Sequence, residues 1–278
     1  MEIERTPDVA PDHQNKKTKS VHSQLNNTEE KNISVYLKAV MPELPKGFMK
    51  NNPWRIVNAF VAYGIIAAGA FVLISYELPV LVKVFLGLAM GSCFAINGFL
   101  AHEALHGSIF QKKFLQDLVG FFGFALVFNA PTFWRHEHNK MHHGNTQKLL
   151  IDPDAFPTKR IFKQSKYSQR VYKFLPGSKT LRSYLYFFYW FTFHNLMAQT
   201  YFRFRNKTYD GVDHTRCTVE LILQFAVIGG YGYLLGWPNL IYGLVIPFFV
   251  MNYTLMSYIS TNHNFLPLVR ENDPFEAL

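Results

Sequence analysis

Four apolar segments, each long enough to cross a bilayer as a helix, limit the fold of this chain more than any other feature. The first, Trp54–Ser75, has 22 residues and would extend roughly 33 Å as a helix, whereas the hydrocarbon core of a bilayer is about 30 Å thick. The other three are Pro79–Ala101, Cys217–Trp237 and Leu240 to about Thr261. Only Tyr76–Leu78 and Pro238–Asn239 separate the members of each pair, and such short connectors force antiparallel hairpins. We therefore predict an all-α integral membrane protein with four transmembrane helices in two hairpins.

The distribution of charge indicates the orientation of these hairpins. Neither short connector contains Lys or Arg, whereas residues 1–55 contain nine and residues 102–216 contain seventeen. The positive-inside rule then predicts that both hydrophilic segments are cytoplasmic, in a bacterial inner membrane or the endoplasmic reticulum. The net charge is +9, and most of it flanks apolar segments. We expect anionic lipid headgroups or an acidic electron-donor protein as partners, and no nucleic acid.

The remaining segments divide into a tail and connecting elements. Residues 1–33 are polar and predict a disordered N-terminal tail, so that residues 34–278 would form the single domain. Leu115–Asn129 is apolar but too short for a confident crossing, and we predict a re-entrant or interfacial segment. Ser183–Phe202 is rich in aromatic residues with polar interruptions, which favours an amphipathic interfacial helix over a fifth span.

Histidines are concentrated in two short stretches of the chain. Residues 134–143 contain four of the eleven, and in an α-helix His138 and His142 would share one face, with His143 displaced by about 100°. Three neutral imidazoles converging on one point would bind a metal, although a solvated basic loop is an alternative. A second pair, His102 and His106, ends an apolar run and favours a metal site at a membrane surface. The two groups together predict a histidine-rich cytoplasmic cap.

The first pair also satisfies a different motif. His102-Glu103-Ala104-Leu105-His106 fits HExxH, in which two histidines bind zinc and the glutamate is the general base of a metalloprotease. A protease needs one further ligand, whereas this chain supplies a whole second histidine group. The following Gly107 and Ser108 match another family better. The zinc protease stays an alternative interpretation.

That other family has three matching stretches. Ala101–Phe110 (AHEALHGSIF), Trp134–Thr146 with its HNKMHHGNT, and Asp152-Pro153-Asp154 together resemble the membrane fatty acid desaturases. The resemblance covers about residues 35–278. It implies an oxygen-dependent desaturase of lipid metabolism that introduces a double bond into the acyl chain of a membrane lipid, with a di-iron centre as cofactor and O2 as co-substrate. The metal ligands that it implies are His102, His106, His138, His142, His143 and, as an additional iron-proximal histidine, His263.

The chemistry agrees with these residue types. Removing two hydrogens from unactivated methylenes is beyond acid–base groups, and imidazole is a suitable ligand for iron. We expect carboxylates to support the ligands, and Glu103, Glu137, Asp152 and Asp154 are candidates. Trp134 and Arg135 are interpreted either as anchors of the second box at the level of the headgroups or as an ordinary interfacial pair. The sequence contains no haem, iron–sulfur or nucleotide motif, so the electron donor, ferredoxin or cytochrome b5 by the resemblance, would be a separate protein.

The chain departs from the family pattern at one point. A third box, (H/Q)xxHH, is expected beyond the last hairpin, but no other His-His pair is present. We therefore expect a C-terminally truncated chain with an incomplete site. Two alternatives follow from this reasoning, a related di-iron hydroxylase or ketolase and an inactive membrane-bound remnant. His263 could equally cap its helix, and His136, His194 and His214 match no box position.

Overall fold

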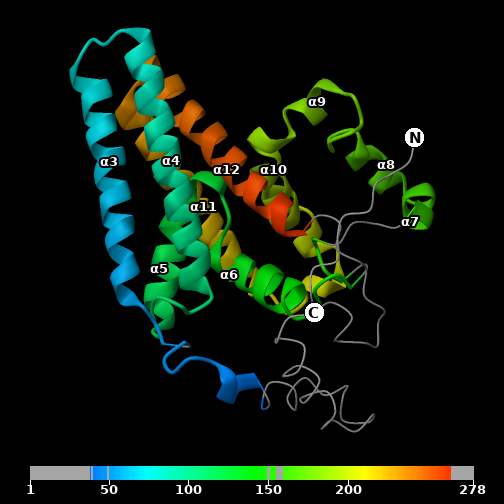
Figure 1. Ribbon diagram of the computed structural model, residues 1–278. Helices are drawn as coiled ribbons and strands as arrows, with labels where there is room; N and C mark the ends of the chain where they lie inside the picture. The colour runs from blue at the N-terminus through cyan, green and yellow to red at the C-terminus, as the bar shows by residue number, and fades with distance from the viewer. Residues whose placement is uncertain (1–37, 39, 49, 149–150, 155–158, 264–278) are drawn as a thin grey trace, which may run out of the picture. The chain divides into compact units, whose positions relative to one another are not determined.

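The structure is a computed structural model that describes residues 38, 40–48, 50–148, 151–154 and 159–263 (Figure 1). All regular elements among these residues are helices. The predicted disordered tail, residues 1–33, lies outside the described residues. The chain divides into two compact units, and the described part of the first contains the short helix η1, Met41–Glu43. All other elements below belong to the second unit, residues 49–269.

Four helices are long and apolar enough to cross a membrane, which confirms the predicted spans. The first hairpin consists of α3, Ile56–Ser75, and α4, Val80–Leu105, and the turn η2, Pro53–Arg55, precedes it. The second hairpin consists of α11, His214–Leu235, the turn η7, Trp237–Asn239, and a helix that begins as η8, Ile241–Val245, and continues as α12, Ile246–His263. Helix α4 packs against both α3 and α12 (Figure 1).

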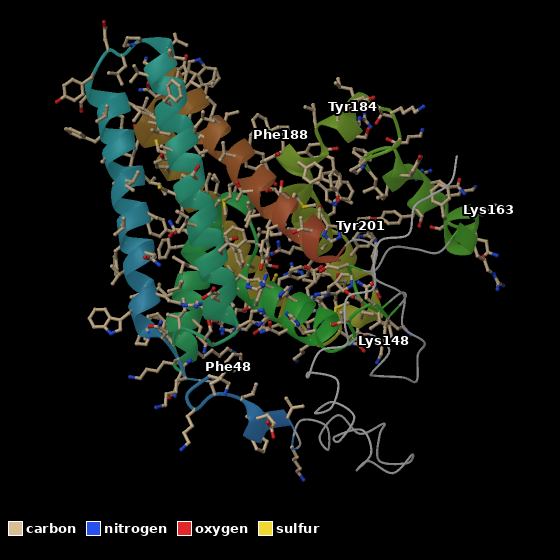
Figure 2. All side chains as sticks on the ribbon, viewed as in Figure 1. Phe48, Lys148, Lys163, Tyr184, Phe188 and Tyr201 are labelled. Atoms are coloured by element: carbon tan, nitrogen blue, oxygen red, sulfur yellow. The ribbon has the colours of Figure 1, made fainter. Side chains whose placement is uncertain are left out.

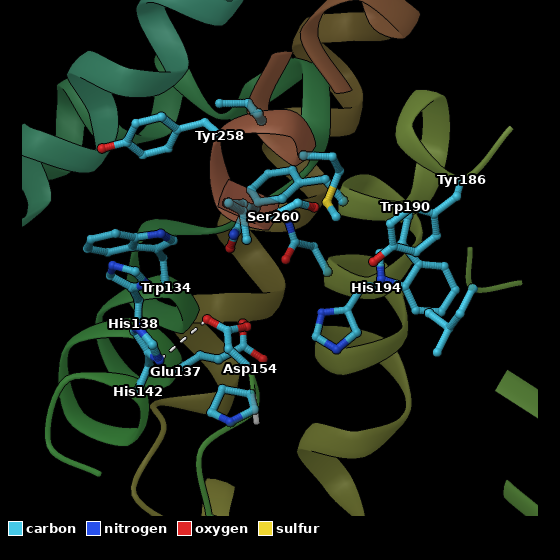
Figure 3. Close-up of a pocket in the computed structure, with 18 of the residues that line it drawn as sticks. Trp134, Glu137, His138, His142, Asp154, Tyr186, Trp190, His194, Tyr258 and Ser260 are labelled. Carbon is cyan, nitrogen blue, oxygen red and sulfur yellow. Dashed lines mark ion pairs between the residues drawn. The ribbon is translucent and has the colours of Figure 1, made fainter. Parts of the chain in front are cut away.

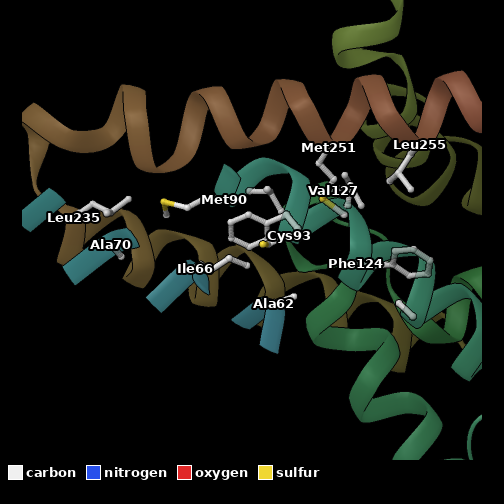
Figure 4. Packing of buried hydrophobic residues seen from close by; sticks show 14 of the residues in the cluster. Ala62, Ile66, Ala70, Met90, Cys93, Phe124, Val127, Leu235, Met251 and Leu255 are labelled. Carbon is white, nitrogen blue, oxygen red and sulfur yellow. The ribbon is translucent and has the colours of Figure 1, made fainter. Parts of the chain in front are cut away.

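The core lies between these helices. Side chains of all four spans meet there, together with the segment after α5 (Figure 4); they include Ala62, Ile66, Met90, Cys93, Phe124, Leu235 and Met251. Glycine allows α4 to approach α12 closely. A Cβ atom on Gly91 would lie 2.6 Å from the Cβ of Val250, a distance that real side chains do not reach. The contact between the two hairpins therefore depends on this missing side chain.

The outer surface of the spans is apolar. Large side chains project from α3 and α4 into the surroundings (Figure 2), and Phe60, Phe71 and Phe85 are among the exposed ones. Exposed Tyr76 and Trp237 lie at the hairpin connectors. Aromatic side chains at the ends of an apolar surface are typical of membrane–water interfaces. The surface is that expected of a protein surrounded by lipid.

A broken segment joins the first hairpin to the second histidine group. It contains α5, Lys113–Gly123, the turn η3, Ala125–Val127, and an irregular stretch in which Phe128 adopts a positive φ of 51°. None of it is long enough to span a membrane. The side-chain amides of two buried glutamines form hydrogen bonds with its backbone. Gln199 accepts from Ala130 N (3.0 Å) and donates to Phe128 O (2.7 Å), and Gln224 donates to the carbonyls of Phe121 and Asn129 (3.1 Å each). The re-entrant or interfacial placement stays a prediction.

The rest of the unit surrounds the histidine groups. The second of them lies on α6, Pro131–Trp134, and the π-helix η4, Arg135–His142. Short helices follow: α7, Lys159–Gln164; α8, Lys166–Tyr172; α9, Leu181–Tyr184; and, after α10, the turns η5, Phe202–Phe204, and η6, Lys207–Tyr209. The predicted Ser183–Phe202 helix is interrupted at Leu185 and continues as α10, Tyr186–Thr200. Thr192 N and Oγ1 donate to Asn252 Oδ1 on α12 (3.1 Å each), which fixes α10 beside that span.

Candidate metal centre

The first histidine group, box 1 (His102–His106), ends helix α4. His102 and His106 are one turn apart, and their ring centroids are 4.6 Å apart. The helix cannot continue beyond them, because Gly107 adopts a φ of +82°, in the left-handed region that favours glycine. Both imidazoles are thus held on a rigid element at the end of a span.

The second group, box 2 (His138–His143), is on a π-helix rather than the predicted α-helix. Its backbone hydrogen bonds join residues five apart, as in His143 N donating to His138 O (2.9 Å). The wider turn brings residues four and five positions apart to the same side. The rings of His142 and His143 accordingly lie 5.2 and 4.6 Å from that of His138. The π-helix thus places the three imidazoles of HxxxHH close together.

The two boxes converge. The Nε2 atom of His138 lies 3.0 Å from Nε2 of His102 and 3.1 Å from Nε2 of His143. An imidazole nitrogen has one proton or one lone pair, so a hydrogen bond accounts for only one of these neighbours. Two nitrogens bound at right angles to one ion at about 2.1 Å would be about 3.0 Å apart. The ligand atoms of His102, His106 and His138 lie within 4.8 Å of one another. The ligand atoms of a second group, His138, His142 and His143, do so as well. The donor set and spacing fit metal ions shared between the boxes.

Trp134 forms one wall of this cluster. It is only 4% exposed, stacks on His138 with centroids 4.4 Å apart, and presents an edge to His102 and His106 at 5.3 and 5.0 Å. The alternative that Trp134 is an ordinary interfacial residue is wrong, because its indole is buried against three imidazoles. That Trp134 anchors box 2 at the level of the headgroups stays a prediction. Arg135 is also turned inward, toward the end of α4.

Burial and mutual repulsion keep most of the imidazoles neutral. Burial, with the charges of neighbouring imidazoles, lowers the pKa of His106 to about 4 and lowers the pKa of His138 further. His142 differs: burial favours its neutral form, but the hydrogen bond to Asp152 and the charges of Asp154 and Asp152 outweigh it and raise the pKa. Neutral imidazole is the form that binds metal, so His106 and His138 are ready to do so at neutral pH.

Two predicted supporting carboxylates contact His142. Asp152, whose side chain is fully buried, accepts a hydrogen bond from His142 Nδ1 (2.9 Å). Asp154 Oδ2 lies 3.4 Å from the same nitrogen (Figure 3). Backbone N–H groups of Gln147 and Asp154 also donate to Asp152, at 2.7 and 2.9 Å. A proton fixed at Nδ1 leaves Nε2 for the metal, as in carboxylate–histidine–metal arrangements.

The other two candidate carboxylates have different partners. Glu137 is buried and receives a hydrogen bond from the Tyr209 hydroxyl (3.1 Å), and burial together with Asp154 raises its pKa to about 8. Glu103 forms an ion pair with Arg55. A zinc protease needs this glutamate beside the metal as a base, so the pairing disfavours the HExxH interpretation.

The structure thus brings together five of the six predicted ligands. The sixth, His263, is the last residue of α12, and its side chain lies outside the described residues. His136 is turned to the Thr208 carbonyl (2.8 Å), and His214 begins α11. His194, which matches no box position, lines the same cavity as the cluster, and burial lowers its pKa. No spacing in the sequence singled it out, because its neighbour in space is on another element.

A cavity of about 1040 Å³ opens onto the histidines. His138 and His142 lie on one wall, and Trp190 and His194 face them from α10 (Figure 3). Much of the remaining lining is apolar or aromatic and comes from α8, α10 and α12; it includes Val171, Tyr186, Phe191 and Leu255. The cluster therefore borders a mostly apolar space, although His106 and His143 are themselves exposed.

The comparison with known proteins agrees with this arrangement. The family model described as "Fatty acid desaturase" matches residues 78–277. An sn-1 oleoyl-lipid 12-desaturase from Synechocystis sp. is 25% identical over 248 residues, which are 83% of this chain and 65% of the relative. An acyl-lipid (9-3)-desaturase from Physcomitrium patens is 34% identical over 56 residues, which are 20% of this chain and 10% of the relative. The chain thus spans less than two thirds of the length of these relatives. It belongs to the fatty acid desaturase family.

Proposed function

We propose that the chain carries the reaction centre of an oxygen-dependent acyl-lipid desaturase, which uses a histidine-ligated pair of irons to introduce a double bond into an acyl chain. One observation supports this most strongly: five imidazoles of two separate boxes lie close together, and those of His102, His138, His142 and His143 line an apolar cavity. The cavity volume of about 1040 Å³ is at the upper end of the range of about 300–1,000 Å³ for ligand sites. Such a site suits a long apolar substrate.

The proposed iron ligands are His102, His106, His138, His142, His143 and His263. When bound, the iron centre supplies, with O2 and two electrons, the oxidising power to take one hydrogen from each of two adjacent methylenes, while O2 is reduced to two waters with two further protons. Imidazole ligands suit iron and bring no negative charge to the site.

The remaining residues of the site orient the metal ligands and enclose the cavity. Asp152 holds the proton of His142 at Nδ1 and so fixes the tautomer that binds metal. Trp134 covers the ring of His138 and excludes water from that side. The aromatic side chains of α10 would hold the acyl chain by apolar contact alone, so that its position depends on the shape of the cavity.

Electrons would come from a separate protein, ferredoxin or cytochrome b5. We further propose that the chain spans the membrane four times, with both boxes on the cytoplasmic side. The absence of Lys and Arg from both hairpin connectors supports this orientation. An acyl chain could then enter from the bilayer while electrons arrive from the cytoplasm.

Product analysis tests the proposal. The chain is expressed in a host membrane that supplies a ferredoxin or a cytochrome b5, and the total fatty acids are analysed by mass spectrometry together with the iron content of the purified protein. We expect bound iron, and a new unsaturated product once a C-terminal segment with the third box is supplied; both should be abolished by His138→Ala and retained in His214→Ala. A hydroxylated or keto product instead would assign the site to a di-iron hydroxylase or ketolase. Absence of iron from the wild-type chain would contradict the proposed centre.

A further inference from the structure

Arg135 joins its own element, η4, to two others at the junction of the two histidine boxes. It is the first residue of η4, three positions before His138, and its side chain is mostly buried. Its Nη1 donates to Leu105 O (2.8 Å), its Nε and Nη2 donate to Asp117 Oδ1 (3.0 and 2.7 Å), and its Nη2 also donates to Gln116 Oε1 (2.9 Å). A single guanidinium thus joins box 2 to the ends of α4 and α5.

The bond from Arg135 to the Leu105 carbonyl is informative because of where that carbonyl lies. Leu105 immediately precedes His106 and is the last residue of α4, where backbone carbonyls lack partners within the helix. A cation is favourable at a helix C-terminus. Asn139, on the other side of His138, donates to the same carbonyl (3.3 Å). Residues on both sides of one ligand are therefore bonded to the backbone beside another.

The hydrogen bonds around Arg135 also reach a further helix, α11. Arg216 on α11 donates to the other oxygen of Asp117 (2.6 Å), so the carboxylate that receives Arg135 is itself fixed. Glu220, also on α11, accepts from Thr132 N and Oγ1 (2.8 Å each) at the start of α6. The helix carrying box 2 is thus anchored at its first turn and at Arg135.

Metal binding allows only small deviations in the positions of the ligands. Ligands that converge on one ion must be held within about 0.5 Å of the productive geometry, and packing of flexible side chains alone does not supply this. We propose that Arg135 is a positioning residue that sets the separation of the two boxes and thereby the affinity and geometry of the metal centre. This inference rests on the proposed histidine-ligated centre. The planar fork of arginine is required, because a lysine ammonium cannot reach the acceptors on α4 and α5 at once.

The experiment titrates Co²⁺ into the metal-free, full chain in detergent and follows the visible absorption of the ion. Arg135→Gln and Arg135→Lys are compared with Arg216→Gln, which also removes a bond to Asp117 but touches neither box. We expect both Arg135 variants to bind Co²⁺ about 10- to 100-fold more weakly, the range for residues that orient metal ligands, with an altered spectrum at saturation. Arg216→Gln should weaken binding much less than either Arg135 variant, because it loosens Asp117 and Glu220 without removing a contact between the boxes.

Each other outcome has a distinct meaning. Wild-type affinity and spectrum in the folded fraction of the Arg135 variants would overturn the positioning role while leaving the metal centre intact. An equal loss in Arg216→Gln would overturn it too, because general loosening of the charge network would then suffice. If neither Arg135 variant folds, Asn139→Ala provides the test: weaker binding supports the role, and unchanged binding overturns it. Failure of the wild type to bind Co²⁺ would refute the proposed centre, and this inference with it.

Discussion

Replacement of Asp152 by Asn should weaken metal binding although the shape of the side chain is unchanged. The carboxylate receives three hydrogen bonds, from the Nδ1 proton of His142 and from the backbone N–H groups of Gln147 and Asp154. Asparagine has one oxygen and one NH2 group, so at least one of these donors would face another donor. The least costly arrangement keeps the oxygen toward His142 and leaves the buried N–H of Gln147 without an acceptor.

The magnitude follows from these bonds. A hydrogen bond to a charged group contributes about 1.5–3 kcal/mol, and loss of the negative charge removes most of that advantage for His142. Since about 1.4 kcal/mol corresponds to a factor of ten, the affinity for Co²⁺ should fall about 10- to 100-fold. The unpaired backbone group should also lower the free energy of unfolding by about 1–3 kcal/mol.

Competition with a chromophoric chelator would give the affinity, and thermal unfolding of the metal-free chain would give the stability. Asp154→Asn is the matched control, because its carboxylate lies farther from His142, at 3.4 Å, and its side chain is 32% exposed. We expect it to change the affinity much less than Asp152→Asn. Wild-type affinity in Asp152→Asn, or equal losses in the two variants, would refute the view that Asp152 fixes the tautomer of His142.

Three further predictions concern stability, measured by thermal unfolding in detergent. Gly91→Ala should destabilise the chain by about 1–3 kcal/mol because its Cβ would overlap α12, whereas Gly229→Ala has nothing within 4 Å and should be neutral; equal effects would contradict the close packing. Gln224→Leu should cost about 1–3 kcal/mol by leaving two buried carbonyls unpaired, while Gln169→Leu, whose bonds are exposed, should change little. Tyr209→Phe should cost about 1 kcal/mol through loss of its bond to the buried carboxyl of Glu137, which precedes box 2, and unchanged stability would argue against that bond.

The sequence was sufficient for the spans and the hairpins. An apolar segment such as Trp54–Ser75 must be buried in a bilayer or in a protein core. A three-residue connector then allows the two helices only an antiparallel arrangement. The sequence was also sufficient for the histidines of box 1 and box 2, because their types and spacings are themselves the chemical signal. The binding of iron by these histidines, and their cytoplasmic side, stay predictions.

Other features depended on neighbours in space. The π-helix arises at a place where the side chains of Trp134 and Arg135 are both turned inward, and no local pattern distinguishes it from an α-helix. Arg135 could not be separated from other interfacial cations, because its acceptors lie between 18 and 30 positions away in the chain. His194 reaches the cavity only through the packing of α10 on α12.

The two buried glutamines have a consequence for synthesis of the protein. The broken segment before box 2 exposes backbone carbonyls that Gln199 and Gln224 must satisfy, and these residues lie about 70 and 95 positions further along the chain. Unpaired carbonyls away from water are costly. Box 2 therefore cannot reach its final place before Gln224 on α11 has been synthesised, and the two boxes assemble only once α11 packs beside the broken segment.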